Sequence, residues 1–300
     1  MEQHKVTIAI PFYNNKGSIL DAVRSVFAQS YTDWVLLLVN DGSDDGSLEI
    51  VQKIKDERVQ LLNDGSNKGL IYRLNQIIHI TETKYLARMD ADDIMHPLRI
   101  EKQFKYLEEH QYIDVLDTAI YTMDIDKNPI GIRRTEKMTV SYKNLLNNGI
   151  MTHSSIMGKT DWFKNNLYSE DFYRAEDQEL WCRTFRYSVF DRLNEPLLIY
   201  REGNIEIRNY IDSIKSTMKI IRKYGDNFCS FFFIRFLLLR QIGKIITYWI
   251  FGLFHCQYIL SSMRNRKLNK NERELVCRLI IDNAKTLIPG VERNGPFFYQ

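Results

Sequence analysis

The sequence predicts an α/β fold with a mostly parallel sheet flanked by helices, followed by a helical C-terminal extension. Apolar runs of strand length alternate with runs of helical periodicity through the first hundred residues, which favours a parallel sheet with right-handed crossovers. Loops rich in asparagine and aspartate follow three of the four expected strands. Because ligands bind at the carboxyl ends of strands in open α/β sheets, we expect a site among these loops.

The elements of this first part are expected in regular order. Strands are expected at residues 6–10, 34–39, 59–62 and 85–89. Helices are expected at residues 18–29, around 50–54 and at 70–80, where apolar side chains recur at helical spacing. Pro11 ends the first strand, and asparagine, aspartate, glycine and serine form a turn over residues 40–47.

The next part mixes helices and strands. A helix is expected at 97–110, one or two strands at 113–123, a turn at 126–129 and a polar helix at 139–148. Residues 150–157 form an apolar segment interrupted by a polar triplet, which predicts a strand whose side chains reach a site. Apolar positions from 180 to 185 have helical spacing, so Glu176 and Asp177 would lie in the first turn of a helix.

Length and charge divide the chain into a main domain and an extension. The chain has 300 residues, of which 44% are hydrophobic and 26% charged, as in globular proteins. We divide the chain into a main domain at residues 1–204, with halves at about 1–95 and about 96–204, and an extension at residues 205–300. The extension has 16 lysines and arginines against 7 acidic residues, whereas residues 1–204 have 25 against 31. A basic extension suits an anionic surface.

Compartment signals are few. The four cysteines show no metal-binding spacing, which is typical of reduced, structural thiols. The amino-terminal apolar stretch is too short for a signal peptide. We therefore expect the catalytic part to lie in the cytoplasm.

The acid cluster at Asp90, Asp92 and Asp93 follows the fourth expected strand. Asp90 and Asp92 are separated by the small Ala91, so both can offer oxygen atoms to one hard cation such as Mg²⁺ or Mn²⁺. Asp93 is expected to hold the loop in shape. In isolation such a pattern is more often a solvated turn, and Glu176 and Asp177 in a first helical turn can equally be explained by the helix dipole.

Six segments taken together carry a family resemblance. They read VTIAIPFYN, VNDGSDDGS, NKG at 67–69, YLARMDADDIMHPLRIEKQ, THSSIM and AEDQELWCR. In this order and spacing, over roughly residues 5–202, the chain resembles the inverting nucleotide-sugar glycosyltransferases of family 2, which have the GT-A fold, and in particular those of bacterial surface-polysaccharide synthesis. Neither a G-x-G-x-x-G nor a G-x-x-x-x-G-K-[ST] motif occurs, which weakens dinucleotide and P-loop interpretations.

The resemblance makes residues 1–204 the catalytic domain, with a nucleotide-sugar-binding half at about 1–95 and an acceptor half at about 96–204. It also implies roles for the donor side. Asp41 matches the aspartate that binds the nucleobase, and a carboxylate can accept its N–H. Further donor-binding positions are Pro11, Tyr13, Asn14, Asn67 and Arg88. Asp90 would face the ribose or a metal-bound water, and Asp92 would bind the divalent cation that bridges the diphosphate.

The resemblance also implies roles for the acceptor side. Asp177, in the family's Glu-Asp pair with Glu176, would act as general base. His153 and Trp181 would lie near the acceptor or diphosphate, although His153 can equally be a core histidine bonded to the backbone.

Two departures stand out from the family pattern. Asp117 occupies a position where relatives commonly have glycine. Residues 202–204 replace a His-rich or Ser-rich loop, which removes support for donor contacts there.

Residues 228–260 of the extension are dense in phenylalanine, leucine and isoleucine. Because Arg235, Arg240 and Lys244 interrupt the first half, we expect a pair of interfacial helices, with residues 228–268 meeting anionic lipid. A spanning helix at 245–263 and a buried helical hairpin on the catalytic domain are the alternatives. The expected location is peripheral, on the cytoplasmic face of the membrane.

The function expected from these features is sugar transfer from a nucleotide sugar, by default a UDP-sugar, to a hydroxyl of a lipid-linked saccharide. The reaction would be inverting and assisted by a divalent cation, and no nucleic-acid partner is expected. One alternative is a non-catalytic nucleotide-sugar-binding or scaffolding subunit. The other is a nucleotidyltransferase, which would need a glycine-rich basic loop after the first strand, where this chain reads PFYNNKGS.

Overall fold

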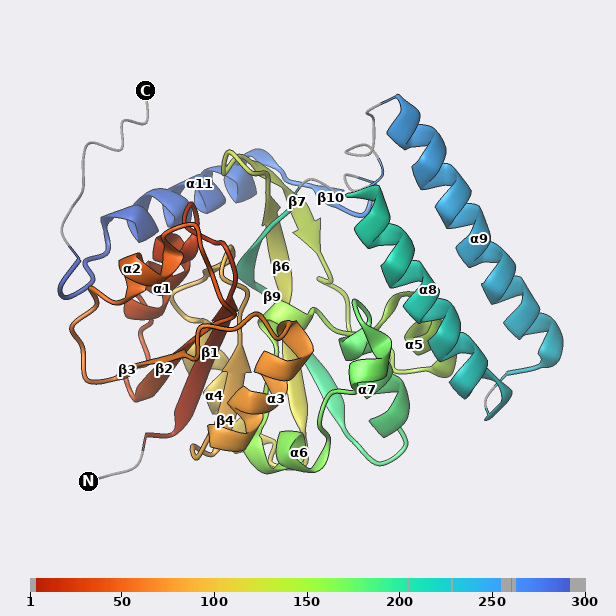
Figure 1. The fold of residues 1–300 in the computed structure, drawn as a ribbon, viewed down its shortest axis with the longest axis horizontal. Helices are drawn as coiled ribbons and strands as arrows, with labels where there is room; N and C mark the ends of the chain where they lie inside the picture. The colour runs from red at the N-terminus through yellow and green to blue at the C-terminus, as the bar shows by residue number, and fades with distance from the viewer. Residues whose placement is uncertain (1–3, 204–205, 228, 255–259, 261–262, 292–300) are drawn as a thin grey trace.

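The structure is a computed structural model that describes residues 4–203, 206–227, 229–254, 260 and 263–291. Its first half is a parallel sheet in the order β3-β2-β1-β4. The strands are β1 (Val6–Phe12), β2 (Trp34–Asn40), β3 (Val59–Asn63) and β4 (Tyr85–Arg88). The connecting helices are α1 (Ile19–Phe27), α2 (Ser47–Val51) and α3 (Leu70–Ile80). The alternation expected from the sequence is confirmed (Figure 1).

The rest of the sheet is largely antiparallel, so the expectation of a mostly parallel sheet is corrected to a mixed one. The strands are β5 (Ile94–Met95), β6 (Val115–Met123), β7 (Pro129–Arg133), β8 (Met157–Lys159) and β9 (Phe190–Arg201), and α4 (Arg99–Glu109) precedes β6. The expected turn at 126–129 joins β6 to β7, and so short a connection makes adjacent strands antiparallel. The pairing of β6 with β9 is parallel.

The strand expected over 150–157 is wrong for most of its length. A 3-10 helix, η1 (His153–Ser155), occupies the polar triplet, and β8 begins only at Met157. The Ser155 hydroxyl donates to the Thr152 carbonyl at 3.1 Å and accepts from the Thr118 amide at 3.2 Å. Such local side-chain hydrogen bonds compete with a strand ladder.

A helical layer covers the second half of the sheet. Its members are α5 (Tyr142–Asn148), α6 (Thr160–Asn165), η2 (Glu170–Phe172) and α7 (Glu176–Thr184). Trp181 of α7 is fully buried and packs on Trp162 and Phe190, with ring centroids 6.1 and 5.3 Å apart. This aromatic core fixes α7, and with it Glu176 and Asp177, against the sheet.

Part of the C-terminal region returns to the catalytic core. The two-residue strand β10 (Arg266–Lys267) pairs with β7, and α11 (Lys270–Lys285) packs across α1 and β7 (Figure 1). Val276 and Ile280 of α11 are buried in one cluster with Ile132 and Met123. Residues 266–285 therefore share a hydrophobic core with residues 1–204.

The other C-terminal helices form a hairpin beside α5 and α7. They are α8 (Ile207–Tyr224) and α9 (Phe231–Leu253), joined through η3 (Gly225–Asn227), and they lie side by side (Figure 1). A pair of interfacial helices was expected over 228–260, and the described part of this segment contains one long helix, α9; residues 228 and 255–259 lie outside the described residues. By length and composition alone α9 can cross a membrane, and 22% of its apolar window is buried.

Candidate active site

A pocket of about 450 Å³ lies at the carboxyl ends of β1 and β2. Pro11 and Tyr13 line it from the end of β1, Asp41 from the end of β2, and Asn67 from the loop before α3. Glu176, at the start of α7, lines the same pocket. The structure thus brings together four of the expected donor positions and one member of the Glu-Asp pair.

Asn14 supports this pocket without being part of its lining. Its backbone is left-handed, with φ 55°, and its amide donates to the Ser43 hydroxyl at 3.1 Å. Its side-chain oxygen accepts from the Asp44 amide at 3.0 Å. Asn14 therefore joins the loops that follow β1 and β2.

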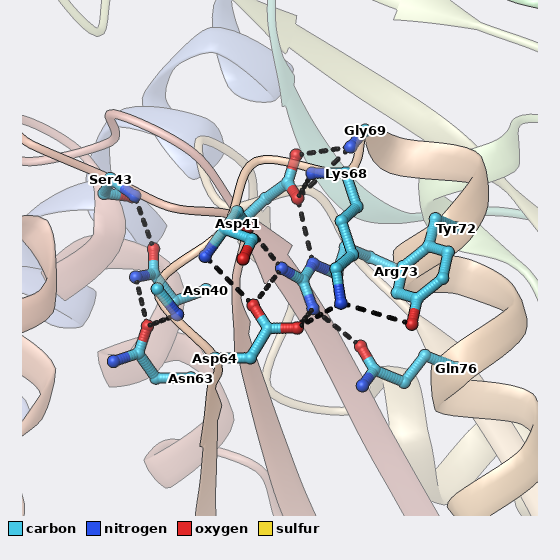
Figure 2. A network of polar contacts seen from close by, with 12 residues as sticks. Asn40, Asp41, Ser43, Asn63, Asp64, Lys68, Gly69, Tyr72, Arg73 and Gln76 are labelled. Atoms are coloured by element: carbon cyan, nitrogen blue, oxygen red, sulfur yellow. Dashed lines mark hydrogen bonds and ion pairs between the residues drawn. The ribbon is translucent and has the colours of Figure 1, made fainter.

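The buried Asp41 is the centre of a hydrogen-bond network (Figure 2). Its Oδ1 accepts from the Lys68 amide at 2.8 Å and from Arg73 Nε at 2.9 Å, and its Oδ2 accepts from the Gly69 amide at 3.0 Å. The guanidinium of Arg73 also makes a two-point contact with Asp64 at 2.6 and 3.0 Å. Since Oδ2 accepts one hydrogen bond from the described residues, it retains capacity to accept another from a ligand.

Arg73 was missed at the sequence level. It is fully buried although it lies on α3 among the apolar residues Ile71, Leu74 and Ile77. A charged residue on the apolar face of a helix was the available signal, because such a group is buried only when it is paired. Gly42 contributes to the same region: a Cβ there would meet the backbone of residues 66 and 67 at 2.8 Å, so the two loops approach too closely for a side chain.

The acid loop after β4 brings three carboxylates together. One oxygen from each of Asp90, Asp92 and Asp93 lies within 4.8 Å of the others. Burial and the neighbouring Asp90 raise the pKa of Asp92 to about 6. Asp93 is fully buried, and burial followed by the charges of Asp92 and Asp90 raises its pKa well above the usual range. Such a cluster favours a bound cation, because a cation would offset this repulsion.

Asp93 also ties the acid loop to the end of β9. Its Oδ1 accepts from the Arg201 amide at 2.9 Å, and Arg201 Nε donates to the Asp92 carbonyl at 2.9 Å. The other oxygen of Asp93 makes no hydrogen bond of normal geometry among the described residues, and the Ser154 hydroxyl interacts with this carboxyl and lowers its pKa against the larger effect of burial. Asp93 therefore has both a supporting contact and an oxygen available to an ion.

Arg88 lies between the acid loop and α7. Its guanidinium contacts both oxygens of Asp90, at 2.5 and 3.3 Å, and is buried. It also interacts electrostatically with Glu176 and Asp177. Arg88 does not line the 450 Å³ pocket, so its position suits charge balance among the acidic residues rather than contact with a ligand in that pocket.

Glu176 and Asp177 occupy the first turn of α7, as expected. Burial, followed by the charge of Asp177, raises the pKa of Glu176 to about 7. Burial also raises the pKa of Asp177, against the opposing effects of Arg88 and Arg134. Raised carboxylate pKa values at a cleft are typical of groups that exchange protons near neutral pH.

The two residues expected near the acceptor differ in outcome. His153 Nε2 lies 2.8 Å from the Tyr168 hydroxyl, and burial together with Arg88 holds the pKa of this imidazole well below its usual range. Its role stays a prediction. Trp181 is 0% exposed inside the aromatic core, so its ring is not available to an acceptor and we withdraw that assignment.

Asp117, the departure from glycine, is a structural residue. It is fully buried, accepts two bonds of 2.9 Å from Arg192, and accepts the Thr152 amide at 2.8 Å. It therefore holds the segment that precedes His153.

Comparison with solved structures defines the fold class. The chain resembles Staphylococcus aureus TarS 1–349 in complex with UDP-GlcNAc, with a TM-score of 0.60 and 15% identity over 96% of this chain and 82% of that one. It also resembles the mannosyltransferase PcManGT of Pyrobaculum calidifontis in complex with GDP-Man and Mn²⁺, with a TM-score of 0.56 and 13% identity over 94% of this chain and 86% of that one. The fold is thus an α/β fold of the GT-A type.

Sequence comparison defines the family. Residues 7–192 match the family described as Glycosyl transferase family 2, so the chain belongs to this family and is a glycosyltransferase. An uncharacterized glycosyltransferase of Methanocaldococcus jannaschii is 30% identical over 77% of this chain and 83% of its own length. The Escherichia coli UDP-Glc:alpha-D-GlcNAc-diphosphoundecaprenol beta-1,3-glucosyltransferase WfgD is 26% identical over 84% and 95%.

Proposed function

We propose that this glycosyltransferase moves a hexosyl group from a nucleotide sugar, by default a UDP-sugar, to a hydroxyl of a lipid-linked saccharide, with inversion at the anomeric carbon. The observation that carries the proposal is the single pocket that Asp41 and Tyr13 share with Glu176. A nucleobase partner and a member of the candidate acid-base pair thus line one cavity.

The donor is proposed to bind along the carboxyl ends of β1 and β2. Tyr13 is 49% exposed, so its ring is free to pack against a base. Asp41 Oδ2 accepts a base N–H, and Pro11 and Asn67 complete the wall. A UDP donor is supported by the name of WfgD, which specifies UDP-Glc, and by the UDP-GlcNAc bound to TarS.

A divalent cation, Mn²⁺ or Mg²⁺, is proposed to bind at Asp92 and Asp90, with Asp93 as a further proposed ligand. The fit rests on the three clustered oxygens and on the Asp93 oxygen that makes no hydrogen bond of normal geometry among the described residues. Such an ion neutralises charge on a departing nucleoside diphosphate. The PcManGT structure, a complex with GDP-Man and Mn²⁺, supports the same choice.

Asp177 is proposed as the general base. The acceptor oxygen attacks the anomeric carbon on the face opposite the diphosphate, the bond from that carbon to the diphosphate oxygen breaks, and the hydroxyl proton passes to Asp177. The pKa of Glu176 is raised to about 7, so near neutral pH Glu176 holds a proton part of the time, and while it does, Asp177 has no like charge beside it to oppose its ionisation.

The proposed acceptor and the proposed membrane location are supported by one relative and by the C-terminal extension. WfgD acts, by its name, on a saccharide linked to diphosphoundecaprenol, which supports a lipid-linked acceptor and a role in surface-polysaccharide synthesis. Large apolar side chains of α9 are exposed along its length: Phe231, Phe232, Phe236, Leu239, Ile246, Trp249 and Leu253. Arg235 and Arg240 are exposed beside them. We propose that this face rests on the anionic cytoplasmic surface of a membrane.

A donor screen tests the proposal. The full chain is incubated with radiolabelled UDP- and GDP-sugars, cell membranes and Mn²⁺ or Mg²⁺, and incorporation into lipid-extractable saccharide is counted. We expect one donor to be used by the wild-type protein and none by the Asp92→Asn or Asp177→Asn variants. Donor binding without turnover across an acceptor panel would instead favour a non-catalytic subunit, and transfer of a nucleotidyl group would favour a nucleotidyltransferase.

A further inference from the structure

We propose that Arg174 binds the diphosphate of the donor, and that α8 sets the position of Arg174 from outside the pocket. The inference rests on the proposed nucleotide-sugar donor. It adds a donor-binding residue that lies outside the segments to which donor binding was assigned from the sequence. Arg174 lies in the turn between η2 and α7, two residues before Glu176.

Arg174 is the arginine of the pocket that has no acidic partner among the described residues. Both Arg73 and Arg174 line it, but Arg73 is fully buried and donates to Asp41 and Asp64. The Arg174 side chain is exposed and makes no ion pair or side-chain hydrogen bond within the described ranges; its guanidinium lies 5.2 Å from the Tyr173 ring. The charged lining residues besides these arginines are acidic, so an anionic ligand in the pocket would find its free cation at Arg174.

The backbone at Arg174 is held in an unusual conformation. Its φ is 64°, a left-handed value that costs a residue with a side chain about 1 kcal/mol. Such strain persists only where the surroundings hold the segment. The Ala175 amide donates to the Phe172 carbonyl at 2.9 Å, which closes the turn on itself.

Helix α8 provides the rest of this support through its side chains. Ser213 Oγ donates to the Arg174 carbonyl at 3.0 Å, and Ser216 Oγ donates to the Tyr173 carbonyl at 2.7 Å. Lys219 Nζ donates to the Asp171 carbonyl at 3.0 Å. Donors spaced three residues apart lie on one face of a helix, so α8 holds the pocket segment along a continuous line of contacts.

Diphosphate is the ligand group that this arrangement favours. A guanidinium matches the paired oxygens of a phosphate. A lipid-linked acceptor also carries phosphate, but Arg174 lines the cavity that Tyr13, Asp41 and Asn67 line. We therefore assign Arg174 to the phosphate of the donor rather than to that of the acceptor.

Calorimetric titration of the full chain tests the inference. UDP and GDP are titrated at fixed Mn²⁺, and the tighter one is then compared with its nucleoside. Arg174→Met should weaken nucleoside diphosphate binding at least tenfold and leave nucleoside binding unchanged, and Arg174→Lys should restore part of the loss. Ser213→Ala combined with Ser216→Ala should weaken diphosphate binding in the wild-type background but not in the Arg174→Met background. Lys215→Ala, on α8 in an exposed pair with Asp212, is the matched control.

Three results for Arg174→Met would overturn the role of Arg174 without affecting the proposed donor. They are an unchanged affinity for the nucleoside diphosphate, an equal loss of affinity for the nucleoside, or a higher KM for the acceptor with unchanged nucleotide affinity. Failure of the wild-type protein to bind any nucleoside diphosphate would overturn the proposed donor as well. The two failures are therefore distinguishable.

Discussion

Arg73 Nε lies 2.9 Å from the Asp41 carboxylate, and neither side chain is open to water: Arg73 is 0% and Asp41 6% exposed. This pair joins α3 to the carboxyl end of β2 and, through the contacts of Asp41 with the Lys68 and Gly69 amides, fixes the loop that carries Asn67 (Figure 2). The donor pocket is thus built on a buried ion pair.

Replacing Arg73 with Met should therefore destabilise the fold and disturb the pocket together. Loss of one partner of a buried ion pair typically costs about 3–5 kcal/mol, and Asp41 would keep only its bonds from the Lys68 and Gly69 amides. The free energy of unfolding in urea measures the loss. Lys68→Ala, which removes a solvent-exposed pair with Asp64, should cost much less, because exposed ion pairs contribute little to stability. Equal stability of Arg73→Met and wild type would show that the pair does not support the loop.

Asp177→Asn should remove turnover without unfolding the protein. A positioned general base typically contributes a factor of roughly 10²–10⁴, and asparagine keeps the shape of the side chain. Steady-state kinetics give the loss, and thermal unfolding checks that the fold persists. Asp161→Asn, exposed on α6, is the control. A near-normal kcat in Asp177→Asn would exclude Asp177 as the base.

Divalent cations should stabilise the protein through the acid loop. An ion that binds only the folded state adds about 2.7 kcal/mol at a concentration one hundred times its Kd. Thermal unfolding with Mn²⁺, and again after addition of EDTA, measures the shift. Asp92→Asn should lose most of it, whereas Asp161→Asn should retain it. The same shift in Asp92→Asn as in wild type would place the ion elsewhere.

Because of Glu176, the free energy of unfolding should fall as pH rises. Its pKa is raised from 4.5 to about 7 by burial and by Asp177, so between these values the folded state holds a proton that the unfolded state has lost. The unfolding free energy should therefore decrease from pH 4.5 to pH 7, by about 2–3 kcal/mol. Glu176→Gln should show a smaller decrease than the wild type, because Asp92, whose pKa is also raised to about 6, still contributes; the exposed Glu170→Gln should match the wild type. Parallel pH profiles for Glu176→Gln and wild type would contradict a raised pKa.

The exposed face of α9 should govern membrane binding. Phe232 and Phe236 are 82% and 58% exposed, and a fully buried phenylalanine is worth about 1.5–3 kcal/mol. Phe232→Ser with Phe236→Ser should weaken sedimentation with phosphatidylglycerol vesicles at least tenfold. Tyr112→Ser is the control, because Tyr112 is 65% exposed but lies in the turn after α4, outside α9. Point variants are preferable to deletion of 228–268, which would also remove β10 from the sheet.

Unchanged sedimentation of the Phe232→Ser, Phe236→Ser variant would contradict the membrane-facing role of α9. An equal loss in Tyr112→Ser would show that the effect does not depend on this helix.

Local sequence patterns predicted the structure correctly where short-range periodicity determines it. The alternation of β1 to β4 with their helices, the first turn of α7 and the clustering of Asp90 with Asp92 all follow from signals within a few residues. Polar side chains predict helix or strand less well, because they can hydrogen-bond to several nearby backbone groups. Residues 153–155 therefore form a 3-10 helix where apolar neighbours indicated a strand.

Long-range partners could not be identified from the sequence. Arg73 is 32 residues from Asp41, and Arg192 is 75 residues from Asp117. Arg174 is positioned by Ser213, which is 39 residues further along the chain. No local pattern indicates such pairs, because the choice of partner depends on how the whole sheet and its helices assemble. The mixed strand order has the same cause.

The anomeric configuration of the product tests the central claim most directly. Once the donor is identified, the product of the wild-type protein is isolated and its new linkage is assigned from the one-bond carbon–proton coupling at the anomeric position. A single displacement with Asp177 as base predicts a configuration opposite to that of the donor sugar, and no product from Asp177→Asn. A product that retains the configuration of the donor, or one that carries a nucleotidyl group in place of the sugar, would contradict the account.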